Sequence, residues 1–142
     1  MTKDVLVSVA GLQFEVDQDA PIEVITTGEY YFKNQKHFVL YEEILDGYSE
    51  VTKNTVKVSD KQVEIMKKGS SNVHMIFEEN KKNMTYYNTP FGELLIGIHT
   101  TLIDVKEEED NIQIKIEYIL DVNYNYISNC EITIHIKAKG EK

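Results

Sequence analysis

IQIKIEYILDV, residues 112–122, decides the fold class of this chain. Apolar residues occupy every second position from Ile112 to Val122, and most positions between them carry polar or charged residues. Successive side chains of a β-strand point to opposite faces, so this pattern predicts a strand with one face in a core and the other in water. The same two-residue period recurs along the chain, and no stretch has convincing helical periodicity. The sequence therefore predicts an all-β protein, and this pattern identifies no reaction.

About ten strands are expected, joined mostly by short turns. The candidate strands are residues 5–16, 22–32, 37–45, 49–58, 62–67, 72–78, 84–89, 93–105, 112–124 and 126–137. Turn-forming residues separate several of them, among others Asn34-Gln35, Asp46-Gly47, Ser59-Asp60, Glu79-Asn80 and Asp110-Asn111. Closing such a meander removes the exposed edges that would otherwise aggregate. We therefore predict one domain over residues 1–142, a single closed or nearly closed antiparallel β-barrel of about eight to ten strands.

Composition and charge disfavour several classes of partner. The chain has 142 residues and a formal net charge of −9, which argues against a nucleic-acid binder because such a protein needs a basic surface. Every cation is lysine, and the absence of arginine disfavours bidentate phosphate or carboxylate capture. The N-terminus lacks the pattern of a signal peptide, and no segment is long and apolar enough to span a membrane. A soluble cytoplasmic protein without membrane contact is expected, and the single cysteine, Cys130, fits a reducing compartment.

No recognised catalytic or metal-binding motif is present. The four histidines, His37, His74, His99 and His135, are not at metal-ligand spacing, and neither H-E-x-x-H nor Cys-x-x-Cys occurs. His74 and His135 alternate with apolar residues and are expected to point outward. There is no G-x-S-x-G elbow and no glycine-rich phosphate loop that leads into a helix. We therefore expect no metal and no cofactor, and assign no catalytic residue.

One segment is apolar on both faces. In Leu94-Leu95-Ile96-Gly97-Ile98, side chains of either parity are apolar, so both faces are expected to lie out of water. The barrel interior accommodates one face only. The other can pack against the N-terminal strand, against a loop or against a second subunit. A homodimer through this strand is therefore one of the open alternatives.

Several short motifs resemble those of a known family. They are Lys68-Gly69, Met75-Ile76-Phe77, the turn from Tyr87 to Gly92 (YNTPFG), and Thr100-Thr101. The chain resembles the YwiB-like family, small uncharacterised proteins that carry a domain of unknown function and occur mainly in Firmicutes. The resemblance covers nearly the whole chain, and residues 87–92 are its most specific part. It implies a lipocalin-like or calycin-like barrel in a cytoplasmic bacterial protein, and it implies no established activity. The chain departs at Lys68, where the family usually has arginine, and lysine would not reproduce a bidentate contact.

A small-molecule ligand inside the barrel is the leading functional hypothesis. Barrels of this size either fill with side chains or hold one modest ligand. Many tyrosines are spread over the predicted strands, and a tyrosine combines an apolar body with a polar tip that suits a semi-apolar cavity. The candidate ligand-binding residues are Tyr87, His99 and Thr100, with Lys68 as a charged anchor at the rim. Two alternatives are a filled barrel that acts as an interaction or homodimerisation module, and an enzyme whose polar residues meet inside the barrel.

Overall fold

The computed structural model describes residues 3–11, 23–44, 51–59, 61–69, 72–89 and 92–139, and these form ten antiparallel strands. The strands are β1 (Asp4–Ala10), β2 (Glu23–Lys33), β3 (Lys36–Ile44), β4 (Val51–Ser59), β5 (Gln62–Lys68), β6 (Val73–Glu78), β7 (Lys81–Thr89), β8 (Gly92–Glu107), β9 (Asn111–Val122) and β10 (Asn125–Ala138). The prediction of an all-β fold with about ten strands is confirmed. Within the described ranges, no helix could cross a membrane.

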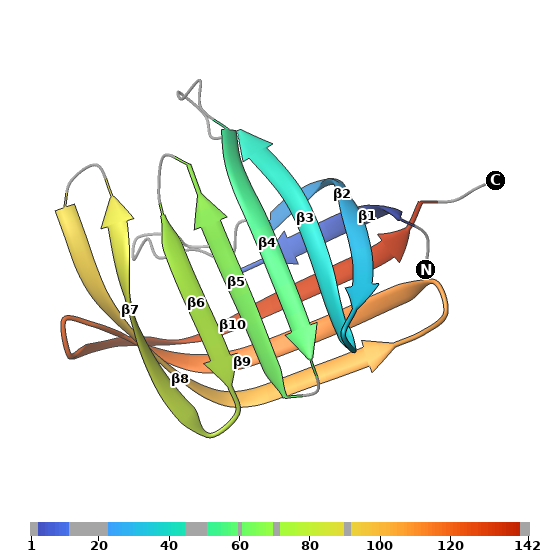
Figure 1. The fold of residues 1–142 in the computed structure, drawn as a ribbon. Helices are drawn as coiled ribbons and strands as arrows, with labels where there is room; N and C mark the ends of the chain where they lie inside the picture. Colours follow the sequence, from blue (N-terminus) through green and yellow to red (C-terminus); the bar gives the residue numbers. More distant parts are fainter. Residues whose placement is uncertain are drawn as a thin grey trace.

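The strands form a nearly closed barrel. Their order in the sheet is β6-β5-β4-β3-β2-β1-β10-β9-β8-β7, so β1 pairs with β10 and the remaining pairs are neighbours along the chain. Among the described residues no ladder joins β6 to β7, and this is the seam of the barrel. The turn between them is tied to β8, because Asn80 N donates to Thr100 O (2.8 Å) and Ile103 N donates to Glu79 Oε2 (3.0 Å). Figure 1 shows β2 to β6 as one layer that crosses the layer of β8 to β10.

Most strand boundaries agree with the predicted ones, and the differences have local causes. β7 begins at Lys81 rather than at residue 84, because its first residues pair with β8 up to Thr100. The predicted turn at Asn34-Gln35 is confirmed, with φ values of 53° and 64°. The β9–β10 turn lies at Asn123-Tyr124, where φ is 52° and 70°, within the strand predicted to reach residue 124. Two successive positive φ values match the twist of a hairpin, and asparagine tolerates this conformation. Residues 12–16 of the first predicted strand lie outside the described residues.

Apolar side chains fill the interior along most of the barrel. In β9 the alternation is complete, since Ile112, Ile114, Ile116, Tyr118 and Leu120 are each at most 3% exposed. They pack with the inward side chains of the other strands, namely Val5, Val7, Val9, Tyr30, Val39, Tyr41, Val56, Val58, Val63, Ile65, Val73, Met75, Phe77, Ile96, Ile98, Ile132, Ile134 and Ile136. Burial of this apolar surface is the main source of stability.

The doubly apolar segment of β8 has one face in this core. Ile96 and Ile98 are fully buried inside, whereas Leu95 is half-buried on the outer face. Gly97 is buried on the outer face, where a Cβ atom would lie 3.0 Å from both Lys82 Cε and Met84 Sδ. Side chains of β7 thus cover part of the outer face, which accounts for part of its apolar character.

Gly28 of β2 lies where its neighbouring strands β1 and β3 leave little room for a side chain. A Cβ atom at this position would lie 2.7 Å from Leu40 O, 2.9 Å from Val7 Cγ2 and 3.3 Å from Tyr41 Cβ. Two of these three atoms belong to backbone or to a β-carbon, so relief requires movement of a strand. The absent side chain therefore sets how closely β1 and β3 pack against β2.

We expect Gly28→Ala to destabilise the barrel by about 1–3 kcal/mol, because the added methyl overpacks this contact. Urea unfolding followed by circular dichroism measures the change as a lower midpoint. The matched control is Thr27→Ala, next along the strand, where the side chain is exposed. Equal midpoints for the two variants would contradict this account of Gly28.

Candidate ligand site at the polar end of the barrel

Polar residues replace apolar ones at inward-facing positions at one end of β3, β4 and β5. The residues are Tyr41, Glu43, Thr52, Asn54 and Lys67, and we call this group the polar end. Sheet register places them together, because Asn54 is the direct cross-strand partner of both Tyr41 and Lys67, and Glu43 is the partner of Thr52. Each has the same strand parity as core residues of its own strand. The polar end therefore continues the inner face of the barrel.

A buried ion pair holds the centre of the polar end. Lys67 Nζ lies 2.8 Å from Glu43 Oε1, and Asn54 Nδ2 donates to the same oxygen at 3.0 Å. The side chains of Lys67 and Glu43 are only 16% and 13% exposed. A charge pair so far removed from water needs both partners, since removing one leaves an uncompensated buried charge. The pair is thus fixed in place and carries no net charge.

Two buried atoms of the polar end have no hydrogen-bond partner among the described residues: Thr52 Oγ1 and Asn54 Oδ1. Thr52 is 3% exposed and Asn54 is 1% exposed. An unsatisfied buried polar atom costs about 1–3 kcal/mol, and most such atoms in native proteins are satisfied by protein, water or ligand. The polar end therefore has hydrogen-bonding capacity that these residues leave unused.

Tyr41 adds a hydroxyl group to the polar end. Burial raises the pKa of the Tyr41 hydroxyl well above its ordinary value, and the nearby Glu43 carboxylate raises it further. The phenol therefore keeps its proton at any physiological pH and can donate a hydrogen bond.

The residues predicted from the sequence do not come together in one site. Thr100 is fully buried inside the barrel, and its hydroxyl is another atom without a described partner. Tyr87 is half-buried against the core, whereas His99 is exposed on the outer face. Because adjacent residues of a strand face opposite sides, His99 and Thr100 cannot line the same cavity. Lys68 ends β5 and is exposed, and it is the neighbouring Lys67 that points inward.

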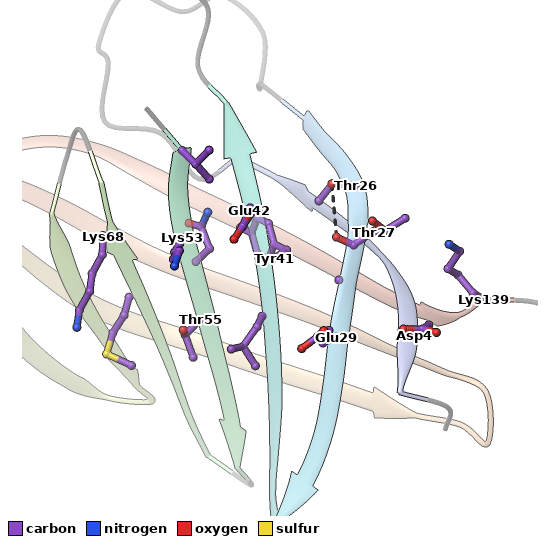
Figure 2. Close-up of a pocket in the computed structure, with 15 residues that line it drawn as sticks. Asp4, Thr26, Thr27, Glu29, Tyr41, Glu42, Lys53, Thr55, Lys68 and Lys139 are labelled. Atoms are coloured by element: carbon purple, nitrogen blue, oxygen red, sulfur yellow. Dashed lines mark hydrogen bonds between the residues drawn. The ribbon is translucent and has the colours of Figure 1, made fainter. Parts of the chain in front are cut away.

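Lys68 lines a groove of about 910 Å³ on the outer face of β2 to β5. Figure 2 shows Glu42 on β3, Lys53 and Thr55 on β4, and Lys68 on β5 around this groove. Lys53 and Lys68 are direct cross-strand partners, and among the described residues neither forms an ion pair. The groove is open, and most of its side chains are at least partly hydrated. A ligand bound in the groove would displace water that already forms hydrogen bonds with these side chains. The groove is therefore weaker evidence for a ligand site than the polar end.

The opposite end of β3 also carries buried polar groups, and these are paired. Tyr30 Oη and His37 Nδ1 lie 2.7 Å apart, and His37 Nε2 lies 3.3 Å from Glu107 Oε1. Burial raises the pKa of Tyr30, and the Glu107 charge contributes. This chain of contacts connects the β2–β3 hairpin with the end of β8, and these are not neighbours in the sheet. It ties two sides of the barrel together at that end.

The polar end was not among the sites predicted from the sequence, although a local signal was present. Glu43 continues the inward series of Val39 and Tyr41, and Lys67 continues that of Val63 and Ile65. The local signal is a polar residue, near the end of a strand, at a position whose side chain faces the core. Sequence alone does not show that such positions on three strands are adjacent, because that depends on register. The predicted outward orientation of His74 and His135 is confirmed.

Thr52→Val should stabilise the ligand-free protein by about 1 kcal/mol, because it removes an unpartnered buried hydroxyl at nearly constant volume. Thermal unfolding of ligand-stripped protein measures the effect. The control is Thr55→Val on the outer face of the same strand, where no gain is expected. A lower melting temperature for Thr52→Val would mean that the hydroxyl has a structural partner.

Comparisons with known proteins agree with this fold. The model of a family described as "Domain of unknown function (DUF1934)" matches residues 7–134. The chain is 31% identical over 123 residues to an uncharacterised β-barrel protein, YwiB of Bacillus subtilis (strain 168), covering 83% of this chain and 85% of the relative. The crystal structure of the ywiB protein from Bacillus subtilis matches with a TM-score of 0.79 at 26% identity, covering 97% of this chain and 93% of that chain.

Proposed function

This chain belongs to the DUF1934 family, and on that premise we propose that it is a small-molecule-binding barrel whose ligand is held at the polar end. The observation that carries the proposal is the presence of two buried atoms without partners, Thr52 Oγ1 and Asn54 Oδ1, beside the Glu43–Lys67 ion pair. Barrels of the lipocalin-like kind hold one small ligand among inward-facing side chains, which supports the same role.

The arrangement of the ion pair suits a role in positioning neighbouring side chains. Both Lys67 Nζ and Asn54 Nδ2 contact Glu43 Oε1, so the carboxylate is held by two donors. Contacts from two donors to one carboxylate oxygen fix the orientation of the Glu43 side chain. The pair positions Asn54, whose carbonyl oxygen is an acceptor left for a ligand. We therefore assign Glu43 and Lys67 as positioning residues.

Native mass spectrometry on protein purified from its own cells tests this proposal. We expect a species heavier than the denatured chain, with the extra mass lost on denaturation. Asn54→Leu should reduce the bound fraction at least tenfold, because it removes the acceptor and one of the donors to Glu43. Thr55→Val, on the outer face of the same strand, should leave the bound fraction unchanged. A bare wild-type chain, or an adduct retained by folded Asn54→Leu, would overturn the assignment.

A second candidate function is a homodimerisation or interaction module that uses the outer face of β7 and β8. Two large exposed side chains of β7 lie near half-buried Leu95: Met84 (42%) and Tyr86 (59%). Tyr86 is the direct cross-strand partner of Leu95, so these two lie side by side. Exposed groups of apolar and aromatic side chains mark interaction surfaces, and a second copy of the chain is the partner proposed here.

This alternative predicts a dimer whose fraction rises with protein concentration. Light scattering coupled to size-exclusion chromatography measures the mass over a hundredfold concentration range. Tyr86→Lys should yield monomer throughout, because it places a charge in the contact. The control is Tyr31→Lys, an exposed tyrosine on β2. A wild-type monomer at every concentration would exclude the module as a homodimer.

A further inference from the structure

The charges of the polar end cancel, which restricts the ligand it can take. Lys67 and Glu43 contact each other at 2.8 Å and are mostly shielded from water. A charged ligand would be desolvated beside a pair that is already neutral, and so would lack a counter-charge. An anion would also meet a chain of net charge −9 without arginine. A cation would meet the Lys67 ammonium. The electrostatics therefore favour a neutral ligand.

The unused hydrogen-bonding groups require a ligand that both donates and accepts. Asn54 offers a ligand the acceptor Oδ1, because its Nδ2 already donates to Glu43 and to Thr52 O. The Thr52 hydroxyl can do both, and Lys67 has N–H groups beyond the one that meets Glu43. The protonated hydroxyl of Tyr41 is a further donor. A hydroxyl group meets both requirements with one atom.

The spacing of these groups requires several hydroxyls on one ligand. Thr52 and Asn54 stand two residues apart on the same face of β4, which separates their Cα atoms by about 7 Å. Tyr41 and Lys67 flank Asn54 on the neighbouring strands, each about 5 Å away. One hydroxyl cannot reach across this area. A ring that carries hydroxyls on successive carbons has the matching size.

We infer that the polar end binds a neutral polyhydroxylated ring compound of about monosaccharide size. The inference rests on the proposed binding function and names its ligand class. Asn54 Oδ1 and the Thr52 hydroxyl accept hydrogen bonds from two ligand hydroxyls, and Lys67 donates to a third. Thr52 and Asn54 are shielded from solvent, so binding requires the side chains that cover them to move, whereas Glu43 and Lys67 retain some exposure.

The test measures melting temperature of the purified full chain with three classes of probe at millimolar concentration. Glucose, ribose and myo-inositol represent neutral polyols, citrate represents anions and spermidine represents cations. At least one polyol should raise the melting temperature by roughly 10 °C at a hundred times its Kd, because it binds the folded state only. Asn54→Leu should lose this shift, and Thr55→Val should keep it.

The outcomes separate this inference from the function on which it rests. If citrate or spermidine stabilises the wild-type chain but not Asn54→Leu, the polar end binds ligands and the polyol class is overturned. If no polyol stabilises the wild-type chain while its native mass retains an adduct, the class is likewise overturned and the binding function stands. If a polyol stabilises Asn54→Leu as much as wild type, the polar end is not its site. If both shift and adduct are absent, inference and function fail together.

Discussion

The antiparallel pairing of β1 with β10 holds the barrel together. It unites two meanders, β1 to β6 and β7 to β10, in one ten-stranded sheet, whose end strands β6 and β7 border the seam of the barrel. Val7 and Val9 pair there with Ile136 and Ile134, and all four side chains are buried. Such contacts are distant in sequence, so their loop-closure entropy must be offset by burial of the shared core. Without closure, the inward faces of both layers would be exposed to water.

Within that closed frame, the two ends of β3 differ in how their buried polar groups are satisfied. At one end Tyr30, His37 and Glu107 form a chain of contacts that ties two sides of the barrel together. At the other, Glu43 Oε1 contacts Lys67 and Asn54, yet Thr52 Oγ1 and Asn54 Oδ1 have no described partner. A structure optimised for stability alone would replace these two residues with apolar ones, as in the middle of the same strand. Local departures of this kind concentrate at functional sites.

The filled interior limits what the barrel can bind. Isoleucine, valine and aromatic side chains occupy the middle of the barrel, whereas the polar end combines clustered polar side chains with unused hydrogen-bonding atoms. The chemistry there is fixed by an ion pair that is neutral overall and by hydrogen-bonding groups spread over three strands. Recognition at such a site depends on hydrogen-bond complementarity rather than on charge. The Lys68-Gly69 motif, which is part of the family resemblance, lies beside the polar end. A Cβ atom on Gly69 would lie 2.8 Å from Thr52 Oγ1.

The sequence by itself determined the fold class, the strand count and the side of the sheet on which most residues lie. These features follow from the two-residue period and from turn residues such as Asn34, both of which are local properties of the chain. Which residues meet depends on how the strands pair. The four predicted site residues lie on different strands or on opposite faces of one strand: Tyr87, His99, Thr100 and Lys68. By contrast, direct pairing across three adjacent strands places Tyr41, Asn54 and Lys67 in one row. Register between strands is set by nonlocal packing, so no local pattern specifies that row.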